Sequence, residues 1–212
     1  MKVLAIGLNY TDHAREVGAS LPEFPFVFAK ASSSIIGDGE PIILPKLSKF
    51  VDYEVELVVV IGSSAKNVKK EDTFDYIRGF TIGNDVTARD IHKADPRSLF
   101  IAKSFDTFCP LGPRTVSQDV LRDPHSLKIS LRVNGETRQA SNTRNMIFKI
   151  PDIISWISQR MTLKEGDIII TGTPAGVGFA RKPPIPLVAG DVIEAEIEGI
   201  GILKNPVLAE NA

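Results

Sequence analysis

The segment DYEVELVVVI (residues 52–61) decides most of what the sequence indicates about the fold. It places Glu54 and Glu56 at the entrance to an unbroken run of aliphatic, mostly β-branched residues. Such a run is typical of a buried β-strand. Side chains two positions apart on a strand leave the same face, so the two carboxylates are expected to point in one direction.

Two neighbouring carboxylates on a partly buried face repel each other and lose hydration, so one of them would stay protonated unless a partner is present. A hard divalent cation removes this penalty because it accepts several oxygen ligands. Asp85 ends another predicted strand and offers a third carboxylate. Carboxylate ligation favours Mg²⁺ or Mn²⁺, with Ca²⁺ as a third candidate, over Zn²⁺. The alternative is that Glu54 and Glu56 line the solvent face of an antiparallel strand.

The remaining pattern predicts a β-rich α+β domain that spans residues 1–212 without a dividing linker. The dipeptide Asn134-Gly135 separates two strand-like segments and predicts a hairpin. Further β-branched runs predict strands at residues 80–82, 127–133, 168–171, 192–197 and 200–203. Helices are predicted at residues 11–17, 87–94 and 151–160, and the proline-rich stretch 182–186 is expected to be a loop.

Composition narrows the class of protein. Hydrophobic residues make up 43% of the 212 residues and the formal net charge is −1, which favours a globular protein and gives no general attraction to nucleic acid or anionic membranes. No apolar run reaches the roughly 18 residues that span a bilayer. The first residues indicate a strand and not a signal peptide. The single cysteine, Cys109, suits a cytoplasmic setting and indicates a packed residue more than a nucleophile.

Two further features indicate acid–base chemistry. His13 and Glu16 are three residues apart on a predicted helix, where the carboxylate can orient the ring and raise its basicity. An ordinary surface helix is the alternative. Lys103 lies among apolar residues and could bind an anion or transfer a proton, unless it is a surface lysine with a buried stem. The loop TGTPAGVG (residues 171–178) can bring backbone amides and the Thr173 hydroxyl to a ligand carboxylate.

Taken together, these segments resemble the fumarylacetoacetate hydrolase family, in its short single-domain form. The resemblance rests on five blocks that occur in the family's order. These are GLNY with His13 and Glu16, and then DYEVEL (52–57), GNDVTARD (83–90), KSFD (103–106) and TGTPAGVG (171–178).

The resemblance implies a mixed β-sandwich roll, a homodimer and a small 2-oxo acid as substrate. It also implies a Mg²⁺ or Mn²⁺ site at Glu54, Glu56 and Asp85, and substrate or catalytic roles for Lys30, Arg89, Lys103 and Thr173. His13 and Glu16 would lie on a lid, expected at residues 11–25, that orders over the substrate. Family members commonly carry Gln where this sequence has His92, which makes His92 a candidate substrate contact that differs from the one in relatives.

Three functions remain open from the sequence. The His13–Glu16 pair favours metal-dependent hydrolysis of a C–C bond in acylpyruvate-like 2,4-dioxo acids, with decarboxylation of oxaloacetate as a second activity. The same residues would serve an isomerase or decarboxylase of unsaturated hydroxy-dioic acids from aromatic-acid catabolism. A non-catalytic protein that binds metal or ligand is the alternative from a different class.

Overall fold

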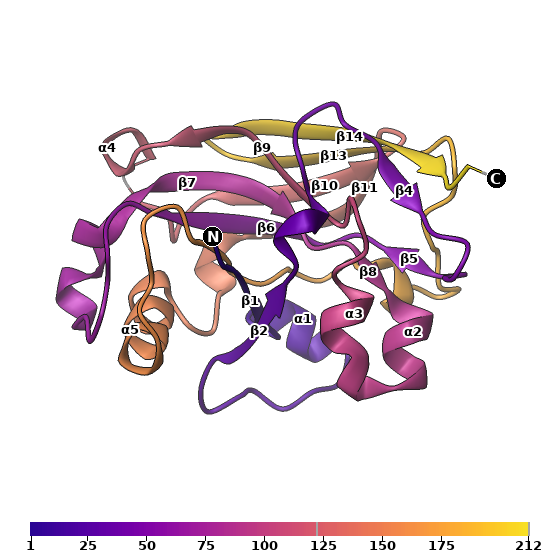
Figure 1. Cartoon of the computed structure of the whole chain (residues 1–212). Coiled ribbons are helices and arrows are strands. Elements are labelled where there is room, and N and C mark those ends of the chain that lie inside the picture. Colours follow the sequence, from indigo (N-terminus) through magenta and orange to yellow (C-terminus); the bar gives the residue numbers. More distant parts are fainter. Residues whose placement is uncertain (122, 212) are drawn as a thin grey trace.

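The computed structural model describes residues 1–121 and 123–211, which form two packed β-sheets with short helices on one side (Figure 1). The larger sheet is mixed, and its strands in spatial order are β2 (Phe26–Lys30), β1 (Val3–Gly7), β12 (Ile168–Ile170), β6 (Val55–Ile61), β7 (Ile77–Asn84), β9 (Cys109–Val116) and β3 (Ile35–Ile36). The second sheet runs in the order β11 (Glu136–Asn142), β10 (Lys128–Val133), β13 (Val192–Ile197), β14 (Gly201–Ala209) and β4 (Ile42–Leu44). The predicted mixed β-sandwich is confirmed.

The helices are short, and most of them lie below the larger sheet in the view of Figure 1. Within the described residues the α-helices are α1 (Thr11–Glu16), α2 (Arg89–Ala94), α3 (Leu99–Ala102), α4 (Gln118–Leu121) and α5 (Ile150–Arg160). Single turns of 3₁₀ helix occupy Ser32–Ser34, Pro96–Ser98, Thr143–Asn145 and Gly178–Ala180, and a longer one occupies Lys70–Tyr76. None of the helices in the described part of the chain is long and apolar enough to cross a membrane.

The central strand β6 directs alternate side chains into two different apolar clusters. Val55, Leu57 and Val59 belong to the large apolar core, whereas Val58 joins a smaller cluster with Val3. This alternation is the period of two that a strand imposes. Glu54 and Glu56 therefore leave the face that carries Val58.

The smaller cluster also contains Cys109, which is fully buried. Burial raises the pKa of the Cys109 thiol to about 12, so at neutral pH the group is an uncharged thiol. This agrees with the expectation of a packed side chain.

One predicted element differs from the structure. Residues 87–94 were expected to form a single helix, but Thr87–Ala88 form strand β8, which pairs with β5 (Val51–Asp52), and α2 begins only at Arg89. The reason is pairing with a segment distant in the sequence, because Thr87 lies opposite Asp52 and the Arg89 amide donates to the Phe50 carbonyl at 2.8 Å. The hairpin at Asn134-Gly135 is confirmed, with Val133 opposite Glu136.

Candidate active site

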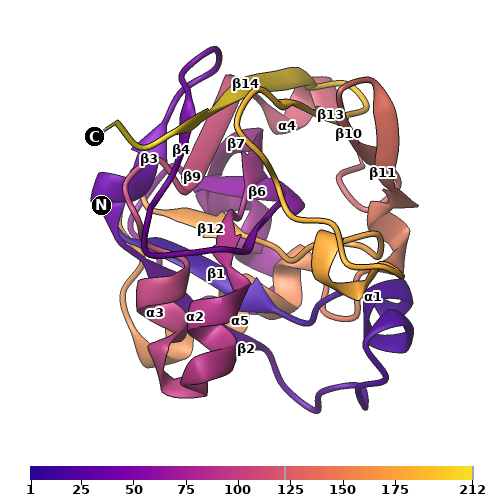
Figure 2. The same cartoon turned by 90° about the vertical axis from the view of Figure 1, so that its right-hand side faces the viewer.

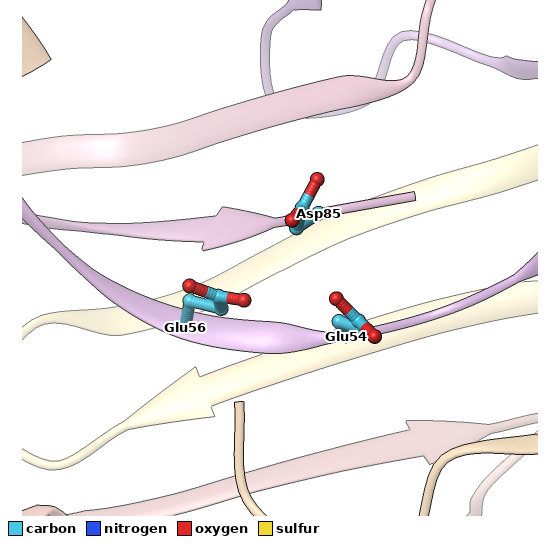
Figure 3. Close-up of side chains that lie close together, drawn as sticks. All are labelled: Glu54, Glu56 and Asp85. Atoms are coloured by element: carbon cyan, nitrogen blue, oxygen red, sulfur yellow. The ribbon is translucent and has the colours of Figure 1, made fainter. Parts of the chain in front are cut away.

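Three acidic side chains meet at the ends of two adjacent strands. Glu54 and Glu56 lie at the start of β6, and Asp85 directly follows β7 (Figure 3). One carboxylate oxygen from each lies within 4.8 Å of the others. All three residues are at most 5% exposed, so the alternative of a solvent-facing pair is wrong.

The pairing of β6 with β7 brings these groups together. Glu56 lies opposite Gly83, and the Asp85 amide donates to the Glu54 carbonyl at 2.9 Å. A Cβ at Gly83 would come within 2.7 Å of Val58 Cγ2 and 3.4 Å of Leu111 Cδ2. The glycine therefore lets these apolar side chains pack closely against β7 beside the carboxylates.

Two buried lysines neutralise part of the acidic cluster. Lys103 Nζ donates to Glu54 Oε2 at 2.7 Å, to Asp85 Oδ2 at 2.6 Å and to Thr87 Oγ1 at 2.9 Å. Lys30 Nζ donates to Asp85 Oδ1 at 2.5 Å and to the Val86 carbonyl at 3.3 Å. Lys103 is thus a buried partner of the carboxylates and not a surface lysine.

Arg89 joins the same network from the start of α2. Its guanidinium donates to Asp52 Oδ2 at 2.9 Å and to Glu54, and lies 4.3 Å from the centre of the Phe179 ring. Asp52 also accepts hydrogen bonds from the Gly178 and Phe179 amides, at 2.7 and 3.1 Å. Sequence reasoning did not single out Asp52, although its place two residues before Glu54, on the same side of the chain, was an available signal.

The fold shifts the pKa values of the ionisable groups in this network in different directions. Burial would raise the pKa of Glu54, but the adjacent Arg89 and Lys103 charges lower it overall. The pKa of Glu56 is well above its usual value because of burial and of the neighbouring Asp85 and Glu54 charges. Burial also opposes the charge of Lys103, but Asp85 and Glu54 raise its pKa overall.

This distribution fits a divalent cation. Glu56 accepts a hydrogen bond from the Gly172 amide, and no ammonium or guanidinium group of the described residues contacts its carboxylate. An all-oxygen set of three buried carboxylates is the ligand type that Mg²⁺, Mn²⁺ and Ca²⁺ prefer. Glu54, Glu56 and Asp85 would hold such an ion, and the identity of the metal stays a prediction.

A cavity of about 390 Å³ opens onto the carboxylates. The walls of the cavity include His13, which is 8% exposed. The Nδ1 atom of His13 lies 2.9 Å from Glu16 Oε2. The other Glu16 oxygen accepts a hydrogen bond from the Gly176 amide at 2.8 Å. With Nδ1–H donating to Glu16, Nε2 is left as the proton acceptor. The remaining polar residues at this cavity are Glu54, Glu56, Asp85, Arg89, His92, Lys103 and Thr173.

Thr173 lies at the same cavity, and its hydroxyl is held from two sides. Its Oγ1 donates to the Val55 carbonyl at 3.0 Å and accepts from Gln139 Nε2 at 2.8 Å. Gln139 also accepts from the Val55 amide, so it ties the loop of residues 171–178 to β6. Gln139 was missed in the sequence because β11 is far from both segments along the chain.

The predicted site residues thus fall into two groups. His13, Arg89, His92, Lys103 and Thr173 line the cavity with the carboxylates, and Glu16 fixes His13. Lys30 lies behind the carboxylates, outside the cavity lining, and contacts Asp85. Substrate contacts by these residues stay predictions.

The expected lid is docked in this structure. Figure 2 shows the chain running from α1 to β2 along one side of the molecule. Asp12 Oδ2 accepts from the Ser141 hydroxyl at 2.5 Å, and the Phe24 ring stacks on Trp156 with centroids 5.4 Å apart. That residues 11–25 open and close stays a prediction.

Known proteins match this chain over nearly its whole length. Residues 2–208 match the family model described as fumarylacetoacetate (FAA) hydrolase C-terminal. The chain is 51% identical over 207 residues to a protein named oxaloacetate tautomerase Fahd2a, mitochondrial, of Rattus norvegicus, a match that covers 98% of this chain and 66% of the relative. It is 54% identical over 209 residues to an uncharacterised protein of Methanocaldococcus jannaschii, covering 99% of this chain and 84% of the relative.

A solved structure named 2-hydroxyhepta-2,4-diene-1,7-dioate isomerase, from Mycobacterium marinum, superposes with a TM-score of 0.88 at 43% identity. That match covers 100% of this chain and 75% of the other. The chain spans about two thirds of the length of the mitochondrial relatives that it matches. With the family model, these sequence identities and the shared fold in agreement, the chain belongs to the fumarylacetoacetate hydrolase family.

Proposed function

We propose that this protein is a metal-dependent tautomerase or isomerase that moves a proton beside the 2-oxo group of small oxo acids such as oxaloacetate. One observation carries the proposal. The three buried carboxylates, the Lys103 ammonium and the His13 ring, which Glu16 holds, face a single cavity of about 390 Å³. Cation-binding oxygens and a general base in one pocket are what enolate chemistry requires.

The chemistry divides among these groups. Glu54, Glu56 and Asp85 would hold a divalent cation, which would supply Lewis acidity to the substrate oxygens. His13 Nε2 takes the proton from the carbon beside the 2-oxo group, and the C–H electron pair forms the C=C bond while the carbonyl pair moves to oxygen. Returning that proton to the oxygen completes the enol, and the reverse sequence gives the keto acid. Glu16 stabilises the imidazolium that forms in between.

Lys103 has a different part in this scheme from the proton donor suggested by the sequence. Its Nζ already donates to three acceptors, Glu54, Asp85 and Thr87. We therefore assign it the role of a fixed positive charge near the developing enolate oxygen, which also positions two of the carboxylates. Lys30 positions Asp85 in the same way from the other side.

Relatives support this choice among the reactions of the family. The rat relative is named a tautomerase and the mycobacterial structure an isomerase. Both words denote rearrangements that keep all atoms of the substrate. The test follows the decay of the enol form of oxaloacetate by absorbance in a stopped-flow instrument. We expect acceleration over buffer with Mn²⁺ or Mg²⁺ alone, loss of that acceleration with EDTA, and recovery with excess metal. A rate equal to that of metal and buffer would refute the proposal and favour either the hydrolase described next or a non-catalytic binding protein.

Hydrolysis of acylpyruvate-like 2,4-dioxo acids is the second candidate. The contact of 2.9 Å between His13 and Glu16 favours it, because the same base can take a proton from water. The hydroxide would attack the 4-oxo carbon, the bond between carbons 3 and 4 would break, and its electron pair would form the enolate of pyruvate. Loss of acylpyruvate absorbance with release of pyruvate measures this reaction, and decarboxylation of oxaloacetate would be a second activity of the same site.

Assembly is a separate expectation. The homodimer that the resemblance implies stays a prediction, and light scattering of the purified protein measures it directly.

A further inference from the structure

A second cavity adjoins the candidate active site. It has a volume of about 700 Å³, compared with about 390 Å³ for the cavity that holds the carboxylates. The two cavities have Arg89, His92 and Pro96 in common. We call the cavity with the carboxylates the inner cavity and the other the outer cavity, so His92 and its neighbours form the boundary between them.

The outer cavity is lined mainly by carbon. Its other walls include the rings of Phe50, Phe179 and Pro184. A site with such walls and few polar groups is suited to an apolar part of a ligand. Both phenylalanines are only partly covered by the protein itself, so a ligand can still bury apolar area on them.

The charged groups at the outer cavity are already partnered, apart from one at the rim. Arg89 donates to Asp52 and Glu54. Asp90 accepts from the Ser48 hydroxyl at 2.6 Å and from the Lys49 amide at 2.7 Å. Among the described lining residues, Lys93 is an exposed cation that forms no hydrogen bond or ion pair with another described residue.

The surroundings of His92, at the boundary between the cavities, favour the uncharged form of its imidazole. Burial, together with the Arg89 and Lys103 charges, lowers the pKa of its imidazole. An uncharged ring between the two cavities can contact the middle of a substrate without demanding an anionic group there.

We infer that the preferred substrates are 2-oxo acids with an apolar tail, such as an alkyl chain or an aromatic ring, that passes His92 and occupies the outer cavity. The inference rests on the proposed function, because it takes the 2-oxo carboxylate end to lie in the inner cavity. A four-carbon acid such as oxaloacetate would use the inner cavity alone. His92 is then a specificity-determining residue, and Phe50 and Phe179 supply the apolar contact.

N-substituted oxamates test this inference without turnover, because they carry the 2-oxo carboxylate group and an inert amide tail. Binding to the full chain with Mn²⁺ is measured by calorimetry for oxamate and its N-methyl, N-butyl, N-hexyl and N-benzyl derivatives. We expect affinity to rise by about 4-fold for each added methylene, as burial of apolar area predicts. An N-hexyl compound should bind more tightly than an equally long compound that ends in a carboxylate.

Variants assign the effect to the outer cavity. Phe50→Ala should reduce the ratio of N-hexyl to N-methyl affinity by about 10-fold, and Pro184→Trp, on an exposed loop, should reduce it by filling the cavity. Phe100→Ala is the matched control, because Phe100 is 46% exposed on α3 and lines neither cavity. The control should keep the ratio of the unchanged protein.

The outcomes separate the two claims. If oxamate itself fails to bind in the presence of metal, the proposed function and the inference fall together. If oxamate binds but tail length has no effect, the inference alone is overturned. Tighter binding of the carboxylate-ended compound would also overturn it, and would indicate a dioic acid held by Lys93.

Discussion

Glu56 is the acidic side chain whose charge is least compensated by the protein. Its pKa is raised by burial and by Asp85 and Glu54, whereas Glu54 and Asp85 each contact a lysine. We predict that Glu56→Gln, which keeps the shape and the acceptor for the Gly172 amide, abolishes metal binding and lowers kcat/KM by more than about 10²-fold. Titration with Mn²⁺ and steady-state kinetics measure the two effects. Full activity at limiting metal would contradict the metal assignment.

His13 distinguishes the reactions that the site could perform. If it activates water, His13→Ala should lower hydrolysis of acylpyruvates by about 10²–10⁴-fold, whereas decarboxylation of oxaloacetate, which needs no base for water, should decline much less. Glu16→Gln should change the ratio of the two rates in the same direction but less strongly. Equal losses of both reactions in both variants would assign the pair to positioning or to closure of α1, and the role in activating water would be wrong.

At the scale of elements, α5 begins with a hydrogen bond that depends on pH. The Ile150 amide, in the first turn, donates to His125 Nε2 at 3.1 Å, which only a nitrogen without a proton can accept. Burial, and then Lys149, lower the pKa of His125. Its unfolded pKa is about 6.5. Stability should therefore fall as pH drops through 6.5, because the unfolded chain then binds more protons than the folded one.

We expect this loss to be about 1 kcal/mol between pH 7.5 and pH 5, the usual net contribution of one hydrogen bond. Urea unfolding at both pH values measures it. The comparison is with His125→Gln, which should be less sensitive to pH than the unchanged protein. An identical pH dependence in both proteins would exclude His125 as the cause.

The segment that carries His13 gives a second prediction for an element. Residues 11–25 are held to the rest of the chain by a few contacts, among them Glu16 with Gly176, Asp12 with Ser141 and Phe24 with Trp156. Segments with few such contacts open at low free energy. Hydrogen exchange of residues 11–25 should be faster than that of β6 and β7 in the unliganded protein, and should slow when Mn²⁺ and oxamate are added. Protection equal to that of the core strands without ligand would argue against a gating role.

For the molecule as a whole, metal binding should stabilise the fold, because Glu54, Glu56 and Asp85 come from two strands that separate on unfolding. A ligand at about 100 times its Kd adds about 2.7 kcal/mol, which corresponds to a rise of roughly 5–10 °C in Tm for a chain of this size. A thermal scan with and without Mn²⁺ measures the shift. Glu56→Gln is the control and should show almost none, and an equal shift in the variant would place the bound metal elsewhere.

The sequence by itself determined the strands, the Asn134-Gly135 hairpin and the shared face of Glu54 and Glu56. These features depend on neighbours along the chain, since strand periodicity and turn preference are local. The start of α2 was misjudged because pairing of Thr87 with Asp52 overrode local helix preference.

Only the tertiary structure decided how the charges of the site are balanced. Lys30 and Lys103 lie on either side of Asp85, and Asp52 binds Arg89, because the order of strands in the sheet brings together segments that are far apart in the sequence. The place of His92 between two cavities arises in the same way, from the packing of α2 near Phe50 and Phe179. Periodicity fixes the direction in which a side chain points, but the energetics of a buried charge depend on which groups the fold places opposite it.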